Sequence, residues 1–371
     1  MKTAIVHEWF VNYAGSEKCV ESFVNIWKDA DIFALVDFLN DEERSIILKG
    51  KRAHTSFIQN LPMARSKYRN YLPLFPLAIE QHDVSEYDLV ISSSHAVAKG
   101  VITKSNQMHV CYCHTPMRYA WDLYHQYLKE AGLTHGLKSW ITRWMLHRIR
   151  IWDYTTANRP DYFIANSRYT AGRIKKTYNR DAHVIYPPVD VDRFPLEEEK
   201  EDYYVTASRL VPYKRVDLVV DAFAGMKDKK LIVIGDGPDL EKIRAKAAPN
   251  IEIKGFLPFD QMLRYIQKAR AFVFAAEEDF GIMPVEALAC GTPVIALNKG
   301  GTAESVADSV TGIHFSEQDP RSIASAVERF EKSAQRFIPE ELRNHAYRFS
   351  RENFEKNITE FINTKKEKFL R

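Results

Sequence analysis

The chain alternates short apolar runs with helix-like stretches, and this alternation limits the folds that it can adopt. Apolar runs of a few residues, bounded by turn signals, are typical of buried strands. Where such strands alternate with helices, a parallel sheet covered by helices on both faces is favoured. The sequence therefore predicts an α/β protein with two doubly wound domains. The predicted strands are Ala4–Val6, Ile32–Leu35, Leu89–Ser92, His109–Cys113, Tyr162–Ala165, Tyr204–Ala207, Lys230–Ile234, Ile251–Lys254, Ala271–Phe274 and Pro293–Ala296.

A break between the two domains is predicted near Pro187 and Pro188. Consecutive prolines disfavour a helix, and an acidic run over residues 197–201 follows before the next series of strands begins. At 371 residues the chain is long enough for two domains of ordinary size. We expect one domain over residues 1–188 and another over residues 189–344, with ligands at the carboxyl ends of the strands.

The composition argues against several functional classes. No apolar stretch approaches the ~20 residues that a membrane-spanning helix needs. The beginning, Met1–His7, is expected to form a strand, because its apolar run is too short for a signal peptide. Four cysteines without a paired framework fit a reducing cytoplasm. A net charge of +3 is too small to indicate nucleic-acid binding by itself.

Residues 278–296 carry the clearest sign of a ligand site. Pro284 suits the first position of a helix. A helix that begins directly after the Gly281 turn points free N–H groups and a partial positive charge at its ligand, which favours a phosphate. Glu278 and Glu286 flank this phosphate site, and a nucleotide sugar would supply both phosphates and hydroxyls. The alternative is two glutamates that only solvate the turn.

A second signal follows the first predicted strand of the second domain. Arg209 and Lys214 lie on one loop, where they can converge on a diphosphate, the Arg through planar hydrogen bonds and the Lys as a point charge. Positive charge at that place would stabilise a departing diphosphate. The alternative is a pair of solvated loop cations. Gly235 and Gly255 end the next two strands, and the turn at Gly235 lacks the third glycine of a dinucleotide fingerprint.

Two segments of the first domain also follow predicted strands. Gly15 opens a helix, and a glycine there lets the backbone approach a ligand closely. The segment 110–122, Val-Cys-Tyr-Cys-His-Thr-Pro-Met-Arg-Tyr-Ala-Trp-Asp, is the strongest feature of this half. Cys111 and Cys113 would share one face of a strand with no second ligand pair nearby, so we expect buried cysteines and not a metal site. His114 ends the strand, where a lone histidine could also belong to the core.

Together these motifs resemble retaining glycosyltransferases, and glycosyltransferase family 4 in particular. The resemblance implies the GT-B fold, in which two Rossmann-like domains face a central cleft. A C-terminal helix of about residues 345–371 would pack back on the N-terminal, acceptor-side domain, while the C-terminal domain binds the donor. No metal and no other cofactor is implied, since the nucleotide sugar is a substrate.

The resemblance also assigns roles to residues of this chain. His114 and Glu278 would be catalytic. The donor-binding residues would be Arg209, Lys214, Gly235, Gly255, Phe280, Gly281, Ile282 and Glu286. The acceptor-side residues would be Gly15, Arg118, Tyr119, Trp121 and Asp122.

The segments Ile5–Trp9 and Cys111–Pro116 are most similar to bacterial mannosyltransferase-like enzymes of surface polysaccharide assembly. This similarity implies transfer of a hexose, with retention of configuration, from a nucleoside-diphosphate sugar to a glycan or lipid-linked sugar acceptor. GDP-mannose is the first expected donor and a UDP-hexose the second. Two other functions stay open: a nucleotide-sugar 2-epimerase of related fold, and a non-catalytic subunit that binds glycan or membrane.

Two stretches of the first domain, residues 49–79 and 137–150, combine cations with aromatic residues and contain no acidic residue. Such stretches suit the surface of an anionic membrane. We therefore expect a cytoplasmic protein with peripheral attachment to the inner face of the cytoplasmic membrane. Nucleic acid is a competing interpretation, but no recognised binding module is present. The alternative is an ordinary solvated face whose aromatic residues lie in the core.

Overall fold

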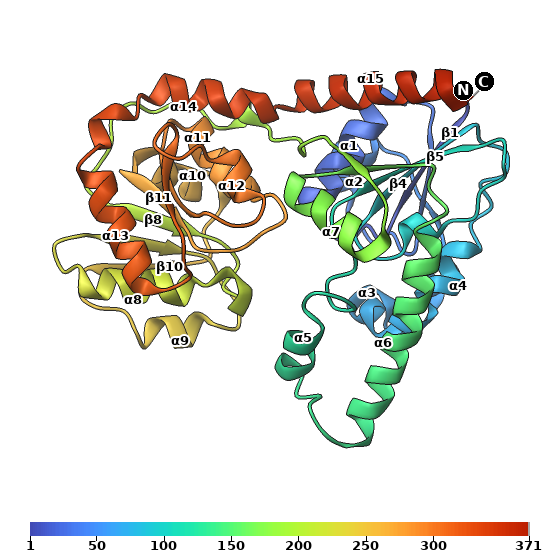
Figure 1. Cartoon of the computed structure of the whole chain (residues 1–371), viewed down its shortest axis with the longest axis horizontal. Helices are drawn as coiled ribbons and strands as arrows, with labels where there is room; N and C mark the ends of the chain where they lie inside the picture. The colour runs from blue at the N-terminus through green and yellow to red at the C-terminus, as the bar shows by residue number, and fades with distance from the viewer. Residues whose placement is uncertain (370–371) are drawn as a thin grey trace. The chain divides into compact units, whose positions relative to one another are not determined.

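The computed structural model describes residues 1–369, which form two compact units (Figure 1). The first unit consists of residues 1–187 together with the segment that begins at Phe354, and the second consists of residues 188–353. The chain therefore returns to the first unit after it has completed the second.

The first unit is built on a seven-stranded parallel sheet with the strand order β3-β2-β1-β4-β5-β6-β7. The strand order reverses between β1 and β4, which makes the sheet doubly wound. Its strands are β1 (Thr3–His7), β2 (Asp31–Ala34), β3 (His54–Thr55), β4 (Leu89–Ser94), β5 (Met108–Cys113), β6 (Tyr162–Ala165) and β7 (Ala182–Val184). Its α-helices are α1 (Gly15–Ile26), α2 (Asp41–Leu48), α3 (Ala64–Lys67), α4 (Phe75–Glu80), α5 (Tyr124–Glu130), α6 (Gly136–Thr156) and α7 (Arg168–Tyr178), joined by most of α15 (Arg351–Phe369).

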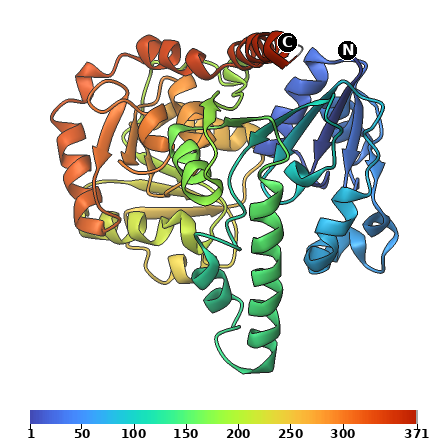
Figure 2. The same ribbon diagram turned by 45° about the vertical axis from the view of Figure 1, so that its right-hand side comes forward.

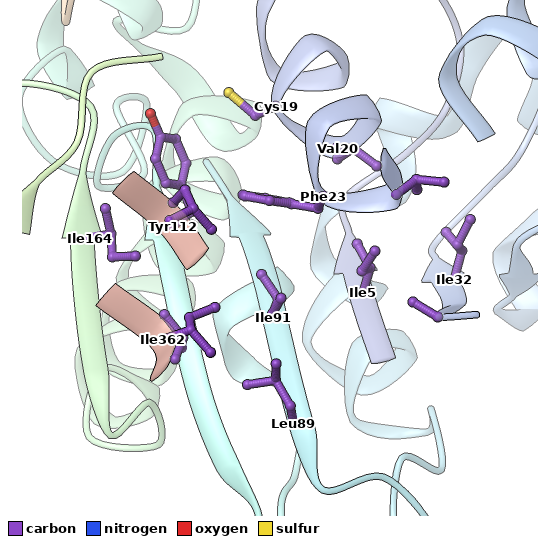
Figure 3. Packing of buried hydrophobic residues seen from close by; sticks show 14 of the residues in the cluster. Ile5, Cys19, Val20, Phe23, Ile32, Leu89, Ile91, Tyr112, Ile164 and Ile362 are labelled. Carbon is purple, nitrogen blue, oxygen red and sulfur yellow. The ribbon is translucent and has the colours of Figure 1, made fainter. Parts of the chain in front are cut away.

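One face of this sheet packs against helices from both ends of the chain. Figure 3 shows Ile5, Ile91 and Tyr112 of the sheet close to Phe23 of α1 and Ile362 of α15. All five residues are at most 2% exposed. Burying one such side chain stabilises the folded protein by about 1.5–3 kcal/mol relative to leaving the side chain in water. The C-terminal helix is therefore part of the core of the first unit.

The opposite face of the sheet is covered by α4 and α6. Val6 and Val90 of the sheet lie in one cluster with Phe75 and Ile79 of α4 and Ile149 of α6. Because helices cover both faces of a parallel sheet, its strands are apolar on both sides.

The second unit contains a six-stranded parallel sheet with the strand order β10-β9-β8-β11-β12-β13. Its strands are β8 (Tyr204–Ala207), β9 (Leu231–Ile234), β10 (Ile251–Gly255), β11 (Ala271–Phe274), β12 (Val294–Leu297) and β13 (Gly312–Phe315). Its α-helices are α8 (Val216–Gly225), α9 (Leu240–Arg244), α10 (Phe259–Lys268), α11 (Ile282–Ala289), α12 (Thr302–Ser305), α13 (Pro320–Glu331) and α14 (Pro339–Ala346). This sheet reverses between β8 and β11.

These two sheets confirm the predicted α/β fold class with two doubly wound domains. All ten predicted strands are present, with ends within two residues of the prediction. The strands that the sequence did not predict, β3, β7 and β13, all lie at sheet edges, where a strand can be short and carry a weak apolar signal.

The prediction for Pro284 is wrong, because α11 begins at Ile282 and Pro284 is its third residue. A proline is tolerated there because the N–H groups of the first turn have no partner within the helix.

Candidate functional site

The predicted donor-binding residues lie on loops that follow four neighbouring strands of the second sheet. Gly255 ends β10, Gly235 follows β9, Arg209 lies after β8, and Glu278 lies after β11. Because the strands are parallel, these loops all leave the sheet at the carboxyl ends of the strands, where doubly wound sheets bind their ligands. The N–H of Gly235 donates to the carbonyl of Gly255 at 2.8 Å, which ties two of the loops together.

Lys214 and Glu278 form an ion pair on these loops, beyond the carboxyl ends of the strands. Their side chains are 15% and 19% exposed, so the pair is shielded but still reaches solvent. The Lys214 Nζ also lies 5.7 Å from the centre of the Phe274 ring. An ammonium group has three donors, so Lys214 can bond a phosphate oxygen and keep its bond to Glu278. Arg209 is exposed on the same loop.

Helix α11 begins directly after Gly281, as predicted for a phosphate-binding turn. Gly281 has a φ of 83°, and a Cβ on it would lie 2.6 Å from Oγ1 of Thr302, so a side chain there would be strained. The N–H groups of the first turn lack partners within the helix and, with the helix dipole, favour an anion. Glu286 lies within the same helix and is buried. The Phe280 side chain is buried against the ring of Phe349, 5.4 Å away between centres.

Two glycines that the sequence analysis did not single out, Gly300 and Gly301, bring a further loop against Glu278. The Gly301 N–H donates to the Glu278 carbonyl at 2.8 Å. A Cβ on Gly300 would lie 2.4 Å from that carbonyl oxygen, and a Cβ on Gly301 would lie 2.1 Å from the carbonyl oxygen of Asp279. The loop can approach the Glu278 backbone only because these residues lack side chains. The signal in the sequence was a pair of adjacent glycines in the loop that follows a predicted strand.

In the first unit, His114 directly follows β5 and belongs to a cluster of three histidines. Its Nε2 lies 2.8 Å from the hydroxyl oxygen of Ser93, and Nδ1 of His7 lies 3.2 Å from the same oxygen. The His95 ring lies 6.0 Å from the ring of His7 and 6.1 Å from that of His114. Burial lowers the pKa of His114, and the neighbouring His95 and His7 lower it further. A neutral imidazole can accept or donate a hydrogen bond to a sugar hydroxyl.

A buried carboxylate, Glu8, holds His95 in this cluster, and the sequence analysis gave it no role. It accepts hydrogen bonds from the Ser94 hydroxyl and from the N–H groups of residues 95–98, at 2.7–3.1 Å. Burial raises the pKa of Glu8, but His95 and the backbone N–H groups outweigh this effect and hold the pKa below its usual value. Glu8 thus stays charged and fixes the turn after β4.

Two of the predicted acceptor-side residues, Arg118 and Tyr119, line one pocket of the first unit together with His95. Gly15 is the first residue of α1 and does not line this pocket.

The other two acceptor-side residues, Trp121 and Asp122, contact other parts of the first unit. The Trp121 Nε1–H donates to Oδ2 of Asp153 at 2.7 Å, and Asp122 forms an ion pair with Arg173. The structure therefore brings Arg118 and Tyr119 to the pocket and directs these two residues to α6 and α7.

The two cysteines of β5, Cys111 and Cys113, are buried, as the strand pattern predicted. Burial raises the pKa of the Cys113 thiol well above its usual value, so this thiol stays protonated. Across residues 1–369, no group of three or more histidine, cysteine, aspartate or glutamate side chains is arranged to hold a metal ion.

Comparison with known protein families decides the membership of the chain. Residues 32–193 match the model described as Glycosyltransferase Family 4, and residues 189–353 match the model described as Glycosyl transferases group 1. The chain belongs to glycosyltransferase family 4. The two matches divide this family 4 chain close to the boundary between its structural units.

Curated relatives match the family 4 chain over about half of its length. An uncharacterized glycosyltransferase of Methanocaldococcus jannaschii is 29% identical over 198 residues, which cover 52% of this chain and 56% of that protein. A GDP-mannose-dependent alpha-(1-6)-phosphatidylinositol monomannoside mannosyltransferase of Mycolicibacterium smegmatis is 29% identical over 201 residues, or 46% of this chain and 53% of that protein. The chain thus spans about half the length of these relatives.

Solved structures resemble the family 4 chain over nearly its whole length. HepE of Anabaena, solved in complex with UDP, has a TM-score of 0.70 at 18% identity and covers 98% of this chain and 100% of its own. Sucrose-phosphate synthase of Thermosynechococcus elongatus has a TM-score of 0.72 at 15% identity and covers 98% and 99%. At these identities the likeness concerns the fold, and it confirms GT-B.

Proposed function

We propose that this chain is a retaining hexosyltransferase whose donor is a nucleoside-diphosphate sugar. The observation that carries the proposal is the Lys214–Glu278 ion pair next to the N-terminus of α11. In this proposal, the diphosphate oxygens accept hydrogen bonds from Arg209, Lys214 and the N–H groups that follow Gly281. Glu278 faces the donor sugar. Glu286, on the same helix, holds the ribose.

The proposed reaction leaves negative charge on the departing diphosphate, and Arg209 and Lys214 counter it. An acceptor hydroxyl attacks the anomeric carbon from the face that the diphosphate leaves. The bond from that carbon to the diphosphate oxygen breaks as the glycosidic bond forms, and the configuration is retained. The hydroxyl proton passes to a diphosphate oxygen. Because side-chain cations and backbone N–H groups counter the charge, the proposal includes no metal.

GDP-mannose is the proposed donor, and a UDP-hexose is the second candidate. The similar protein of Mycolicibacterium smegmatis is named a GDP-mannose-dependent mannosyltransferase, which supports the first choice. HepE of Anabaena was solved with UDP and with UDP-glucose, which supports the second.

The proposed acceptor is a glycan or lipid-linked glycan of bacterial surface polysaccharide synthesis, used at the inner face of the cytoplasmic membrane. Support comes from α6, which extends beyond the sheet of its unit in both Figure 1 and Figure 2. Its outward side carries apolar residues at helical spacing that are 43–74% exposed. We call this set the α6 stripe: Leu137, Trp140, Ile141, Trp144 and Ile151.

The α6 stripe has exposed cations beside it, Lys138 and Arg148. An exposed face of tryptophan and aliphatic side chains next to cations suits the surface of an anionic membrane. The first basic stretch differs, since its Tyr68 and Phe75 are buried in the core. We therefore place the proposed membrane contact on α6. No helix among residues 1–369 is long and apolar enough to cross a bilayer.

A thermal-shift panel of GDP-mannose, UDP-glucose and ADP-glucose, run with and without EDTA, tests the donor site. A bound ligand at 100 times its Kd stabilises a protein by about 2.7 kcal/mol, so the true donor should raise Tm clearly. We expect GDP-mannose to do so and EDTA to leave the shift unchanged. If no nucleotide sugar raises Tm, the proposed donor site is wrong.

Incubation of the stabilising donor without acceptor separates transfer from epimerisation. A 2-epimerase converts the sugar of the free donor, whereas the proposed transferase leaves its stereochemistry unchanged. Appearance of the 2-epimer would overturn the proposed function.

A further inference from the structure

The pocket that contains Arg118 and Tyr119 lies wholly within the first unit and has a volume of about 490 Å³. This volume falls in the ~300–1,000 Å³ range of small-molecule sites. Its wall is assembled from segments that are distant in sequence: the turn after β1, the 3₁₀ segment Tyr68–Leu74 with α4, the loops after β4 and β5, helix α5, and helix α6.

The wall is mainly apolar. Leu72 and Phe75 form one side, and Leu128, Leu133 and Leu146 come from the helical hairpin of α5 and α6. A sugar needs hydrogen-bond partners for its hydroxyls, because burying an unpaired hydroxyl costs free energy. A wall of leucine side chains offers none. A hydrocarbon chain that is buried against this apolar surface favours binding by about 0.8 kcal/mol for each buried CH₂ group.

Two cations, Arg69 and Arg118, lie at the same pocket. Arg69 also donates to the Tyr68 hydroxyl at 3.1 Å, which limits its range of positions. Arginine binds phosphate through planar, paired hydrogen bonds. The pocket thus combines an aliphatic wall with groups suited to a phosphate.

The pocket borders the histidine cluster. His95 lines it, and the His95 ring lies 6.1 Å from the ring of His114. Trp9 also lines it and makes an edge contact with His95 at 4.7 Å between ring centres. A group that emerges from the pocket at this side would therefore meet the predicted catalytic histidine.

We propose that this pocket binds the lipid phosphate portion of the acceptor. The hydrocarbon next to the phosphate lies along Leu72, Leu128 and Leu146, and the phosphate or diphosphate bonds to Arg69 and Arg118. The acceptor sugar then extends toward His95 and His114. This proposal rests on the proposed function, and it narrows the acceptor from glycans in general to sugars carried on an anionic lipid.

Isothermal titration with decyl phosphate, kept below its micelle concentration, tests the pocket without a membrane. Decanol and inorganic phosphate serve as the two half-ligands. We expect decyl phosphate to bind at least about tenfold more tightly than either, since it gains both the apolar and the ionic contacts. Equal binding of decanol, or no binding of decyl phosphate, would overturn the proposal.

Two variants locate the binding site. Arg69→Gln removes one proposed phosphate partner, and Ala131→Trp places a large side chain at an exposed position that lines the pocket. Each should weaken decyl phosphate binding by about tenfold. Arg52→Gln and Arg65→Gln remove exposed cations of the same unit that do not line the pocket, and should change the Kd less than about twofold. If all four variants bind alike, the ligand lies elsewhere and the proposal is wrong.

The donor shift with GDP-mannose, measured on the same samples, separates this proposal from the proposed function. If the donor binds and decyl phosphate does not, the lipid phosphate pocket is wrong and the donor site stands. If decyl phosphate binds in the pocket and no nucleotide sugar binds, the pocket stands and the proposed function is wrong.

Discussion

Lys214 and Glu278 form an ion pair although 64 residues separate them in the sequence. They meet because β8 and β11 are neighbours in the sheet, and the loops that follow neighbouring parallel strands begin at the same end of the sheet. The contact therefore depends on the strand order of the second sheet and on the loop geometry around Gly300 and Gly301.

Replacing either Lys214 or Glu278 by alanine should lower kcat about 10²–10³-fold, because each change removes a group proposed to stabilise the transition state. The measurement is steady-state turnover with the donor identified by thermal shift. Lys242→Ala is the matched control, since Lys242 pairs with Asp217 on the surface and is 55% exposed. Near-normal turnover in both Lys214→Ala and Glu278→Ala would refute these roles.

Gly300→Ala should lower both Tm and turnover. Its φ is 72°, and the new Cβ would lie 2.4 Å from the carbonyl oxygen of Glu278, so the backbone must shift. We expect a loss of more than about 1 kcal/mol in the free energy of unfolding. Gly225→Ala, at the end of α8 with no atom within 4 Å of the added Cβ, should leave stability unchanged or slightly higher. Equal Tm values for the two variants would contradict this account of the loop.

The free energy of unfolding should fall as the pH is lowered below about 6.5, where an unfolded histidine begins to bind its proton. Burial lowers the pKa of His109 to about 3 and that of His82 to about 4. Between those values and ~6.5 the unfolded chain binds more protons than the folded chain. Each of the two histidines therefore lowers the free energy of unfolding by about 1.4 kcal/mol for each pH unit of acidification.

Urea unfolding of His109→Gln at pH 7 and pH 5 checks this pH dependence. The glutamine can still bond the Ser92 hydroxyl, which lies 2.8 Å from Nε2 of His109. Between pH 7 and pH 5, the free energy of unfolding should decrease by about 2 kcal/mol less in the variant than in the unmodified protein. His147→Gln, at an exposed position of α6, is the control and should leave the slope unchanged. An unaltered slope in His109→Gln would count against the assignment.

Lys99→Met should be strongly destabilising. Lys99 and Asp153 form an ion pair in which the side chains are 1% and 0% exposed, and Asp153 also accepts from Trp121 and Tyr178. Removing one partner of a buried pair typically costs about 3–5 kcal/mol. Lys175→Met breaks the exposed pair with Asp181 and should cost less than about 1 kcal/mol. Urea unfolding of the two variants should separate them, and similar losses would contradict the prediction.

Trp144→Ser should weaken binding to vesicles of phosphatidylglycerol and phosphatidylcholine in a sedimentation assay at low salt. Trp144 is 55% exposed in the α6 stripe, where its ring can enter the interface. Ile102→Ser removes an apolar side chain that is 53% exposed elsewhere in the first unit, and should not change binding. If the unmodified protein does not sediment with these vesicles, the membrane contact on α6 is wrong.

The sequence was sufficient to predict the fold because its signals are local. Each central strand is a contiguous apolar run, and the turn at Gly281 lies next to the helix that it opens. The edge strands β3, β7 and β13 carry weaker runs and were not predicted.

The parts of the site that the sequence did not reveal depend on contacts between distant segments. Glu8 accepts hydrogen bonds from residues 86–90 positions away, so its role becomes visible only when β1 and β4 are paired. Gly300 and Gly301 matter through the Glu278 backbone, which belongs to another loop. The pocket at Arg118 likewise requires the arrangement of helices around the first sheet.

Helix α15 has a consequence for how members of such a family can recombine. Phe354, Ile358 and Ile362 belong to the core of the first unit, although the whole second unit precedes them in the chain. A fragment that stops at Pro187 would leave that part of the apolar face uncovered. A chimera that exchanges one unit for that of a relative therefore needs two crossover points, one near Pro187 and one near Phe354. A single crossover would pair the first sheet with an α15 that comes from the other parent.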